Sequence, residues 1–179
     1  MLRSEIVDFI CNENDNENIE NRIRNFGGNG LDVVIETAMK HDKHFPINYI
    51  LDHHNNFYLI ENIKNKIFVF GNIHFFTVMN EQNQLKKFKS KRLGLAIKYK
   101  QNELIFNHLL GWICTKQIFR TALHASIKYK NMDLFNYLIG NEELSRFIVK
   151  ESLCACFSST TQMSKQVFEI MSQKYLELL

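Results

Sequence analysis

The sequence Ile-Lys-Tyr-Lys occurs twice in this chain, at residues 97–100 and again at residues 127–130. The flanks agree as well: the first copy lies in LGLAIKYKQNELIFNHLLG and the second in LHASIKYKNMDLFNYLIG. In each copy a small residue precedes the four letters, and polar residues, an acidic residue, an apolar run and a glycine follow. Two matching stretches at a fixed offset predict a repeated supersecondary unit, which constrains the fold more than composition does.

The same register can be followed along the chain, with units beginning near residues 33, 62, 91 and 121. We therefore predict an all-α fold, a solenoid of four to five stacked antiparallel helical hairpins in a single domain, residues 1–179. Each hairpin buries only part of its apolar surface, and stacking on neighbours completes the core. The predicted divisions are a partial N-terminal unit at 1–30, repeats near 33–61, 62–90, 91–120 and 121–149, and a degenerate C-terminal unit at 150–179.

Several local features follow from this register. The second copy predicts a turn at Lys130-Asn131, a helix over 133–139 and a C-cap at Gly140. The first copy has one extra residue, which we place between its two helices. The segment NIKNKIFVF at 62–70 is strand-like by composition, although the register makes it a helix, and FGGNG at 26–30 is typical of a loop.

Residues 121–126, Thr-Ala-Leu-His-Ala-Ser, match the ankyrin signature T-P-L-H-x-A at its Thr, Leu and His, with small residues for Pro and Ala. The chain resembles the ankyrin-repeat family over nearly its whole length, most strongly at 121–140. Its repeats are shorter than is usual in that family and lack the G-A-D-V-N-A ending. The resemblance implies a non-catalytic protein–protein interaction module in which His124 has a structural role, tying neighbouring backbone through hydrogen bonds.

In that family the last two positions of each first helix face the concave, partner-binding side. Lysines beside aromatic rings suit protein recognition, because aromatic residues are enriched in binding hot spots. The alternative is that exposed Lys and Tyr are ordinary helix-surface residues. The resemblance implies that the partner-binding positions are Lys40, His41, Val69, Phe70, Lys98, Tyr99, Lys128 and Tyr129.

A basic stretch, LKKFKSKR at residues 85–92, lies in what we interpret as a connection between repeats. It is either a solvated loop or a docking patch for an acidic partner, a phosphate-bearing ligand or an import receptor. The candidate docking residues are Lys86, Lys87, Lys89, Lys91 and Arg92.

Charge is unevenly distributed along the chain. Residues 1–61 have a net charge of −6, residues 62–130 of +11 and residues 131–179 of −2, within a total of +3. A concentrated positive segment favours a partner with an acidic surface. The alternative function is a nucleic-acid or phosphoinositide binder that uses the same segment.

The chain contains no G-x-S-x-G, P-loop, G-x-G-x-x-G or H-E-x-x-H motif, so we predict neither an enzyme nor a cofactor. His41-x-x-His44 and His53-His54 fall near predicted turns, and we interpret them as turn residues, not metal ligands. The four cysteines form no zinc pattern and are expected to be free thiols. No apolar run reaches the ~18–20 residues of a membrane span, and the N-terminus lacks a signal-like apolar core, so we expect an intracellular protein of the cytoplasm or the nucleus.

The irregular repeats, the small size and the Asn- and Ile-rich composition resemble the small ankyrin proteins of large DNA viruses and insect viruses. Members of that group block host signalling, some by mimicking the inhibitor of NF-κB. The resemblance therefore implies a host signalling protein as the partner. Unusual end units leave dimerisation open as well.

Overall fold

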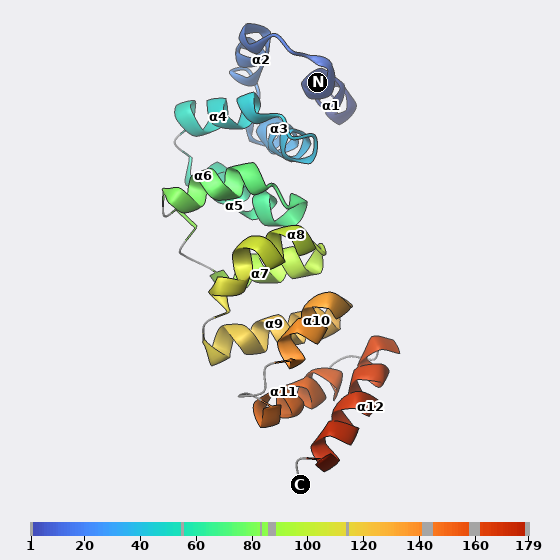
Figure 1. Ribbon diagram of the computed structural model, residues 1–179. Coiled ribbons are helices and arrows are strands. Elements are labelled where there is room, and N and C mark those ends of the chain that lie inside the picture. Colours follow the sequence, from blue (N-terminus) through green and yellow to red (C-terminus); the bar gives the residue numbers. More distant parts are fainter. Residues whose placement is uncertain are drawn as a thin grey trace. The chain divides into compact units, whose positions relative to one another are not determined.

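The computed structural model describes residues 2–54, 56–82, 84–85, 89–113, 115–140, 145–157 and 162–177. Within these ranges every regular element is a helix and there is no strand, which confirms the predicted all-α class. The chain divides into two compact units, Met1–Lys86 (unit 1) and Lys87–Leu179 (unit 2). The helices pack in chain order within each unit (Figure 1).

Unit 1 is organised around the first helix of each pair. Helix α3 packs against α1, α4 and α5, while α2 packs on α4 and α5 packs on α6. The buried apolar residues recur at helical spacing, as Leu59, Ile63 and Ile67 do along α5. The helices are α1 (Arg3–Asn12), α2 (Asn16–Ile23), α3 (Gly28–Lys40), α4 (His44–His53), α5 (Phe57–Phe70) and α6 (Ile73–Glu81).

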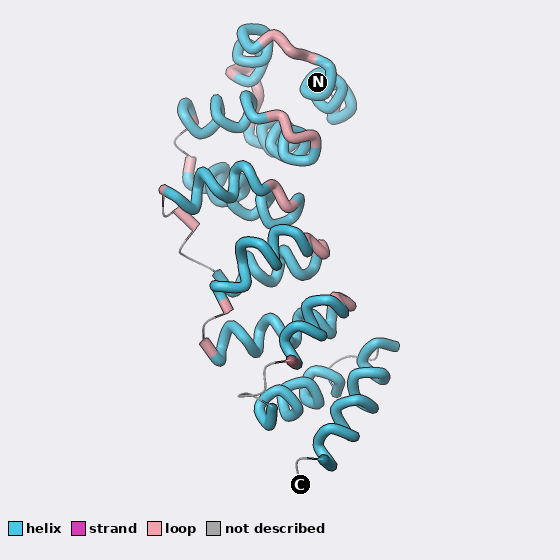
Figure 2. Tube along the Cα trace, viewed as in Figure 1, coloured by secondary structure: helices cyan, strands magenta, loops and turns pink. Residues whose placement is uncertain are grey.

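Unit 2 repeats this arrangement around α9, which packs against α7, α10, α11 and α12. Short turns join the two helices of the first two pairs (Figure 2). The elements are α7 (Lys89–Lys98), α8 (Asn102–Leu104), the π-helix η1 (Ile105–Leu109), the 3₁₀ helix η2 (Leu110–Trp112), α9 (Lys116–Lys128), α10 (Met132–Ile139), α11 (Ser145–Phe157) and α12 (Gln162–Glu177).

One backbone turn recurs at the predicted period. Left-handed φ angles occur, evenly spaced along the chain, at Asp42 (54°), Gly71 (68°), Lys100 (55°) and Lys130 (57°). After each of them the next amide N–H donates to a carbonyl five residues back, at 2.8–3.1 Å. This is the Schellman ending of a helix, in which a left-handed residue stops the helix and turns the chain. The predicted turn at Lys130-Asn131 is confirmed.

The extra residue of the first IKYK copy lies elsewhere than predicted. The amides of residues 99–101 after α7 and of residues 129–131 after α9 donate to carbonyls at the same offsets, so no residue is inserted between the helices. Instead, the second helix of that pair passes into the π-helix Ile105–Leu109. A π-helix has one more residue per turn-closing hydrogen bond than an α-helix, and it therefore absorbs a single insertion.

Residues 62–70 form the end of α5, which confirms the helix that the register predicts against the strand-like composition. Two expectations about glycines are corrected. The glycines at 28 and 30 lie in the first turn of α3, with Gly27 as its N-cap, and not in a loop. Gly140 is the C-cap of α10 but has φ −72°, a right-handed conformation that does not require glycine.

Replacing glycine by alanine should change the free energy of unfolding in opposite directions at two positions, one in a left-handed turn and one inside a helix. Gly71→Ala should lower the free energy of unfolding by about 1–2 kcal/mol, because Cβ disfavours a positive φ. Gly94→Ala, in the interior of α7 where a Cβ would meet no atom within 4 Å, should raise it by about 0.5–1 kcal/mol. Urea denaturation followed by circular dichroism measures both, and equal effects of the two changes would contradict the turn assignment.

Candidate interaction surface

The two IKYK copies give unit 2 a pair of matching helix ends. Lys98 ends α7 and Lys128 ends α9, and in each case a tyrosine follows. The Lys98 Nζ lies 5.2 Å from the centroid of the Tyr99 ring, and the Lys128 Nζ lies 5.5 Å from that of Tyr129. Each cation therefore rests over its neighbouring ring in a cation–π contact, which holds an otherwise mobile lysine in a defined place.

Sequence reasoning missed the residue that completes each copy. Lys100 and Lys130 are exposed and occupy the left-handed turn position, so each helix end presents two lysines around one tyrosine. The sequence did indicate them, since Lys100 and Lys130 are the fourth residue of the two Ile-Lys-Tyr-Lys copies. We call the following set the tip surface of unit 2: Lys98, Tyr99, Lys100, Lys128, Tyr129 and Lys130.

Side chains tie the two turns together. The Asn131 Nδ2 donates to Asn102 Oδ1 at 2.8 Å, and the Asn102 Nδ2 donates to Asp133 Oδ2 at 2.8 Å. Asn131 is buried, and its Oδ1 also accepts from the Leu134 N–H as the N-cap of α10. Because α7 also packs against α9, the two halves of the tip surface are fixed next to each other.

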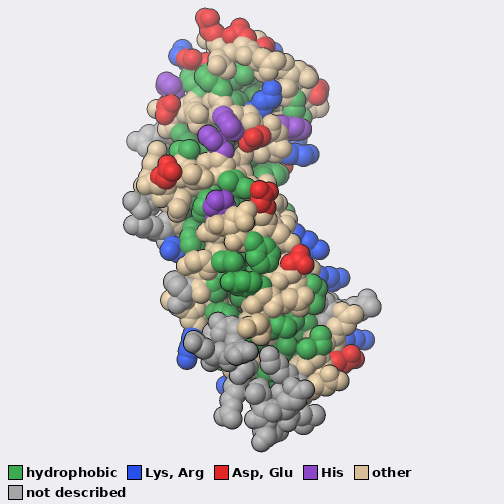
Figure 3. All heavy atoms as spheres, in the orientation of Figure 1, with side chains coloured by type: hydrophobic (Ala, Val, Ile, Leu, Met, Phe, Trp, Pro, Cys, Tyr) green, Lys and Arg blue, Asp and Glu red, His purple; other side chains and the backbone are tan. Residues whose placement is uncertain are grey.

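The charge of the tip surface is not neutralised internally. Among the described residues, none of its four lysines forms an ion pair with a carboxylate. Residues 87–140 contain ten basic and two acidic residues, so the surroundings are positive as well. Lys and Arg side chains appear along the edge of unit 2 in Figure 3. The two acids, Glu103 and Asp133, lie at the start of the second helices.

The predicted basic loop is corrected. Lys89, Lys91 and Arg92 belong to the first turn of α7, not to a connection between repeats. Arg92 is fully buried, at 0% exposure, and cannot contribute to a docking patch. Lys91 is exposed, and the Lys89 Nζ lies 5.4 Å from the Trp112 ring centroid. Lys86 and Lys87 lie outside the described residues.

The corresponding residues of unit 1 have a different chemistry. Lys40 ends α3 and is exposed, as is His41, whereas Phe70 ends α5 and is half-buried beneath the Lys66 ammonium, 5.6 Å away. The turn residue that follows His41 is the acidic Asp42. These positions therefore do not repeat the Lys-Tyr-Lys pattern, and a single binding stripe through all the predicted positions stays a prediction.

Several histidine side chains are visible on the face shown in Figure 3. Two histidines, His44 and His74, lie against each other beside the turn at Asp42. The His44 Nε2 lies 3.0 Å from Asp42 Oδ1, and the His44 and His74 rings are stacked with centroids 3.9 Å apart. His44 lowers the pKa of the Asp42 carboxyl, partial burial opposes this, and the Asn72 amide that donates to Asp42 lowers it further. This cluster joins successive helix pairs. The described residues hold no group of three or more His, Cys, Asp or Glu placed to bind an ion.

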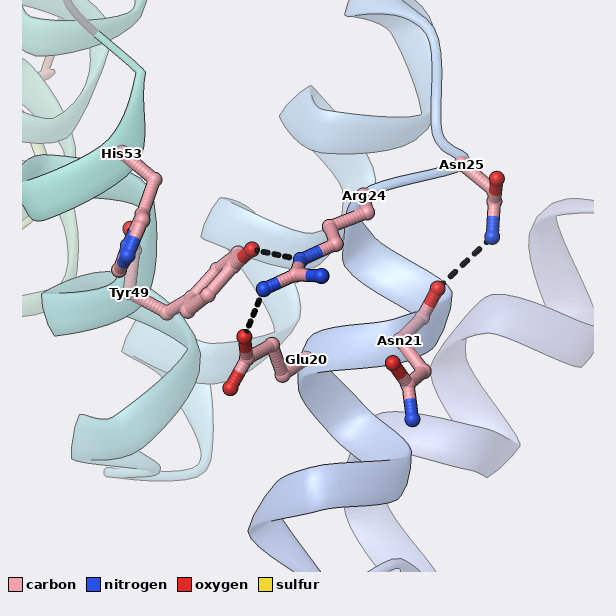
Figure 4. Close-up of polar contacts among 6 residues, drawn as sticks. All are labelled: Glu20, Asn21, Arg24, Asn25, Tyr49 and His53. Carbon is pink, nitrogen blue, oxygen red and sulfur yellow. Dashed lines mark hydrogen bonds and ion pairs between the residues drawn. The ribbon is translucent and has the colours of Figure 1, made fainter.

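Another polar cluster of unit 1 is structural as well. The Arg24 Nε donates to the Tyr49 hydroxyl at 2.8 Å, and the same guanidinium pairs with Glu20, which links α2 to α4 (Figure 4). The Tyr49 ring stacks on His53, with centroids 4.3 Å apart. His53, which the sequence predicted as a turn residue, is instead the last residue of α4 and is engaged in this stack.

His124 is held by a different contact from the one that the resemblance implies. Its Nε2 lies 3.2 Å from the Glu151 Oε2 on α11, and the Arg120 Nη2 lies 2.8 Å from the other carboxylate oxygen. The bond thus joins side chains of α9 and α11 instead of tying neighbouring backbone. Glu151 is only 6% exposed, so the Arg120 guanidinium balances a buried charge, to which the His124 ring adds a hydrogen bond.

The cysteines give no redox pair in the described part of the chain. Cys11, Cys154 and Cys156 are free thiols there, and Cys114 lies outside it. Cys154 is exposed while Cys156 is buried, as expected for residues two apart on a helix. Burial raises the pKa of the Cys156 thiol, which disfavours the reactive thiolate.

Comparison with known proteins found no family model, no curated protein and no solved structure that matches this chain. Within the described residues, no helix is long and apolar enough to cross a membrane. Arguments about function therefore depend on the chain's own residues.

Proposed function

We propose that this protein is a non-catalytic protein–protein interaction module, and that the tip surface of unit 2 binds an acidic surface of its partner. The observation that supports this is a pair of identical Lys-Tyr-Lys tips on adjacent turns, with four exposed lysines that no described carboxylate neutralises. Tyrosine, the aromatic residue of each tip, is one of the residue types enriched in binding hot spots.

The proposal includes an architecture and a partner class. Each unit would be built from ankyrin-type hairpins stacked as a solenoid, and the regular recurrence of the left-handed turns supports this reading. A host signalling protein, as for viral mimics of the inhibitor of NF-κB, enters the proposal only through the resemblance of the sequence. The exposed Lys40 and His41 and the half-buried Phe70 of unit 1 are a secondary contact region in this proposal.

Affinity capture tests the proposal with a charge-matched control. Wild-type protein, a Lys98→Ala, Tyr99→Ala, Lys128→Ala, Tyr129→Ala variant and a Lys150→Ala, Lys165→Ala variant are each used as bait in cells that express the protein. We expect the four-residue variant to lose at least one retained protein that the control keeps, since both variants remove two exposed lysines. An unchanged set of retained proteins would remove the tip surface as the binding site.

The positive charge of residues 87–140 favours one other candidate, a polyanion binder that recognises nucleic acid or phosphoinositide headgroups. A salt titration separates the two. Binding of a duplex oligonucleotide that weakens by about 10³-fold or more between roughly 50 and 200 mM salt would indicate several phosphate contacts and favour this candidate. An absence of oligonucleotide binding at low salt would exclude nucleic acid.

A further inference from the structure

We propose that the two tips of unit 2 bind one extended segment of the partner at two points, through acidic side chains three residues apart. This inference rests on the proposed function and adds to it the conformation and spacing of the partner's segment. It starts from the duplication: each tip holds a cation–π pair followed by a lysine at a left-handed turn, with φ angles of 55° and 57°. Two copies of one site favour a ligand with two copies of one group.

The separation of the two sites follows from helix packing. Helices in contact have axes about 8–10 Å apart, and α7 and α9 are in contact. Both sites lie at the C-terminal ends of these helices, and the Asn131–Asn102 hydrogen bond of 2.8 Å fixes one turn against the other. The helix ends that carry the two lysine pairs are therefore about 10 Å apart and fixed against each other, which reduces the entropy lost on binding.

That separation selects one regular conformation of a short peptide. In a polyproline II helix the rise is about 3.1 Å per residue with three residues per turn, so residues i and i+3 lie about 9 Å apart on the same side. In a β-strand, residues on one side are about 7 or 13 Å apart, and neither value fits. The tyrosine rings at the two tips also suit proline, because aromatic surfaces are what polyproline II segments dock on.

Three fluorescent peptides with identical Gly-Ser flanks test the spacing by anisotropy against the full chain. Their central sequences are Glu-Pro-Pro-Glu, Glu-Glu-Pro-Pro and Gln-Pro-Pro-Gln. We expect the spaced peptide to bind about threefold to tenfold more tightly than the adjacent one at low salt, since exposed ion pairs are individually weak and two must act together. Equal or tighter binding of the adjacent peptide would overturn the inference.

Variants locate the effect. Two double variants each remove the lysines of one tip: Lys98→Gln with Lys100→Gln, and Lys128→Gln with Lys130→Gln. Each should abolish the preference for the spaced peptide, because the remaining tip binds only one acidic side chain. The Lys150→Gln, Lys165→Gln control should retain the preference. Circular dichroism checks that each variant is folded, and glutamine retains much of the length of the side chain at the turn.

The outcomes separate this inference from the proposed function. If both acidic peptides bind equally and the tip variants weaken both, the spacing is wrong and the acidic-partner function stands. If neither binds better than the glutamine peptide, the inference fails, and the capture experiment decides the function separately. Tighter binding of an alanine-rich helical peptide with Glu at i and i+7 would also overturn the inference, since it places acids about 10 Å apart on a helix.

Discussion

Replacing Arg120 by Met and His124 by Phe together should lower the free energy of unfolding of the protein by about 3–5 kcal/mol. The reason is Glu151, a residue only 6% exposed, whose carboxylate pairs with the Arg120 guanidinium and lies within hydrogen-bond distance of the His124 ring nitrogen. A buried carboxylate left without a cation loses its water and gains nothing in return, and this cost exceeds the modest value of an exposed pair. Chemical denaturation followed by circular dichroism measures the change.

A third substitution supplies the control for this experiment. Adding Glu151→Leu to the double variant removes the uncompensated charge, and most of the lost stability should return, because an apolar set of similar volume commonly replaces a buried ion cluster without loss. A double variant that loses less than about 1 kcal/mol, or a triple variant no more stable than the double, would show that Glu151 is solvated in solution. Either result would remove the ion cluster as a link between α9 and α11.

The repeat is the part of the fold that the sequence predicts well. The letters IKYK place an apolar residue in the core and two polar residues at a helix end, and both copies do so: Ile97 and Ile127 are 0% exposed and the lysines that follow are exposed. The period is detectable because each of these helices ends in the same way, with a left-handed residue followed by an amide that donates to a carbonyl five residues back.

Arg92 shows why the basic stretch was misinterpreted. A run of lysines and arginine is usually solvated, and composition gives no reason to treat one member differently. Alignment of the two IKYK copies pairs Arg92 with Ala122, and both are fully buried in the face that also holds Leu93 and Ala96. The helical register, in which Arg92 and Ala96 share a face, therefore predicts that Arg92 is buried, whereas the number of charges in the stretch does not.

The π-helix and the Glu151 cluster were beyond sequence reasoning for different reasons. A one-residue insertion can be absorbed in a turn, a loop or a helix, and its energetic cost at each place depends on packing that a single sequence does not report. The partners of Glu151 lie far from it in sequence, on another helix, and only the relative placement of α9 and α11 brings the charges together. The acid itself is one of many with no distinguishing neighbour in sequence.

Phe68→Ala should lower the free energy of unfolding by about 3–5 kcal/mol, because Phe68 is fully buried in α5 and contacts the Phe76 ring edge-on at a centroid distance of 6.0 Å. Phe57→Ala provides a matched control in the same helix: its ring is 76% exposed, and we expect a change within about 0.5 kcal/mol. Urea denaturation measures both, and residue-level hydrogen exchange shows whether protection is lost first in unit 1.

A third member of the series distinguishes helix from strand for the segment whose composition favours a strand. In a strand, Phe68 and Phe70 would share one face, and their alanine variants would have similar costs. In the helix, Phe68 belongs with Ile63 and Ile67 in the core, while Phe70 is half-buried at the helix end under Lys66. Phe70→Ala should therefore cost less than half as much as Phe68→Ala, and equal costs would contradict both the helix and the placement of Phe70 at the predicted contact position.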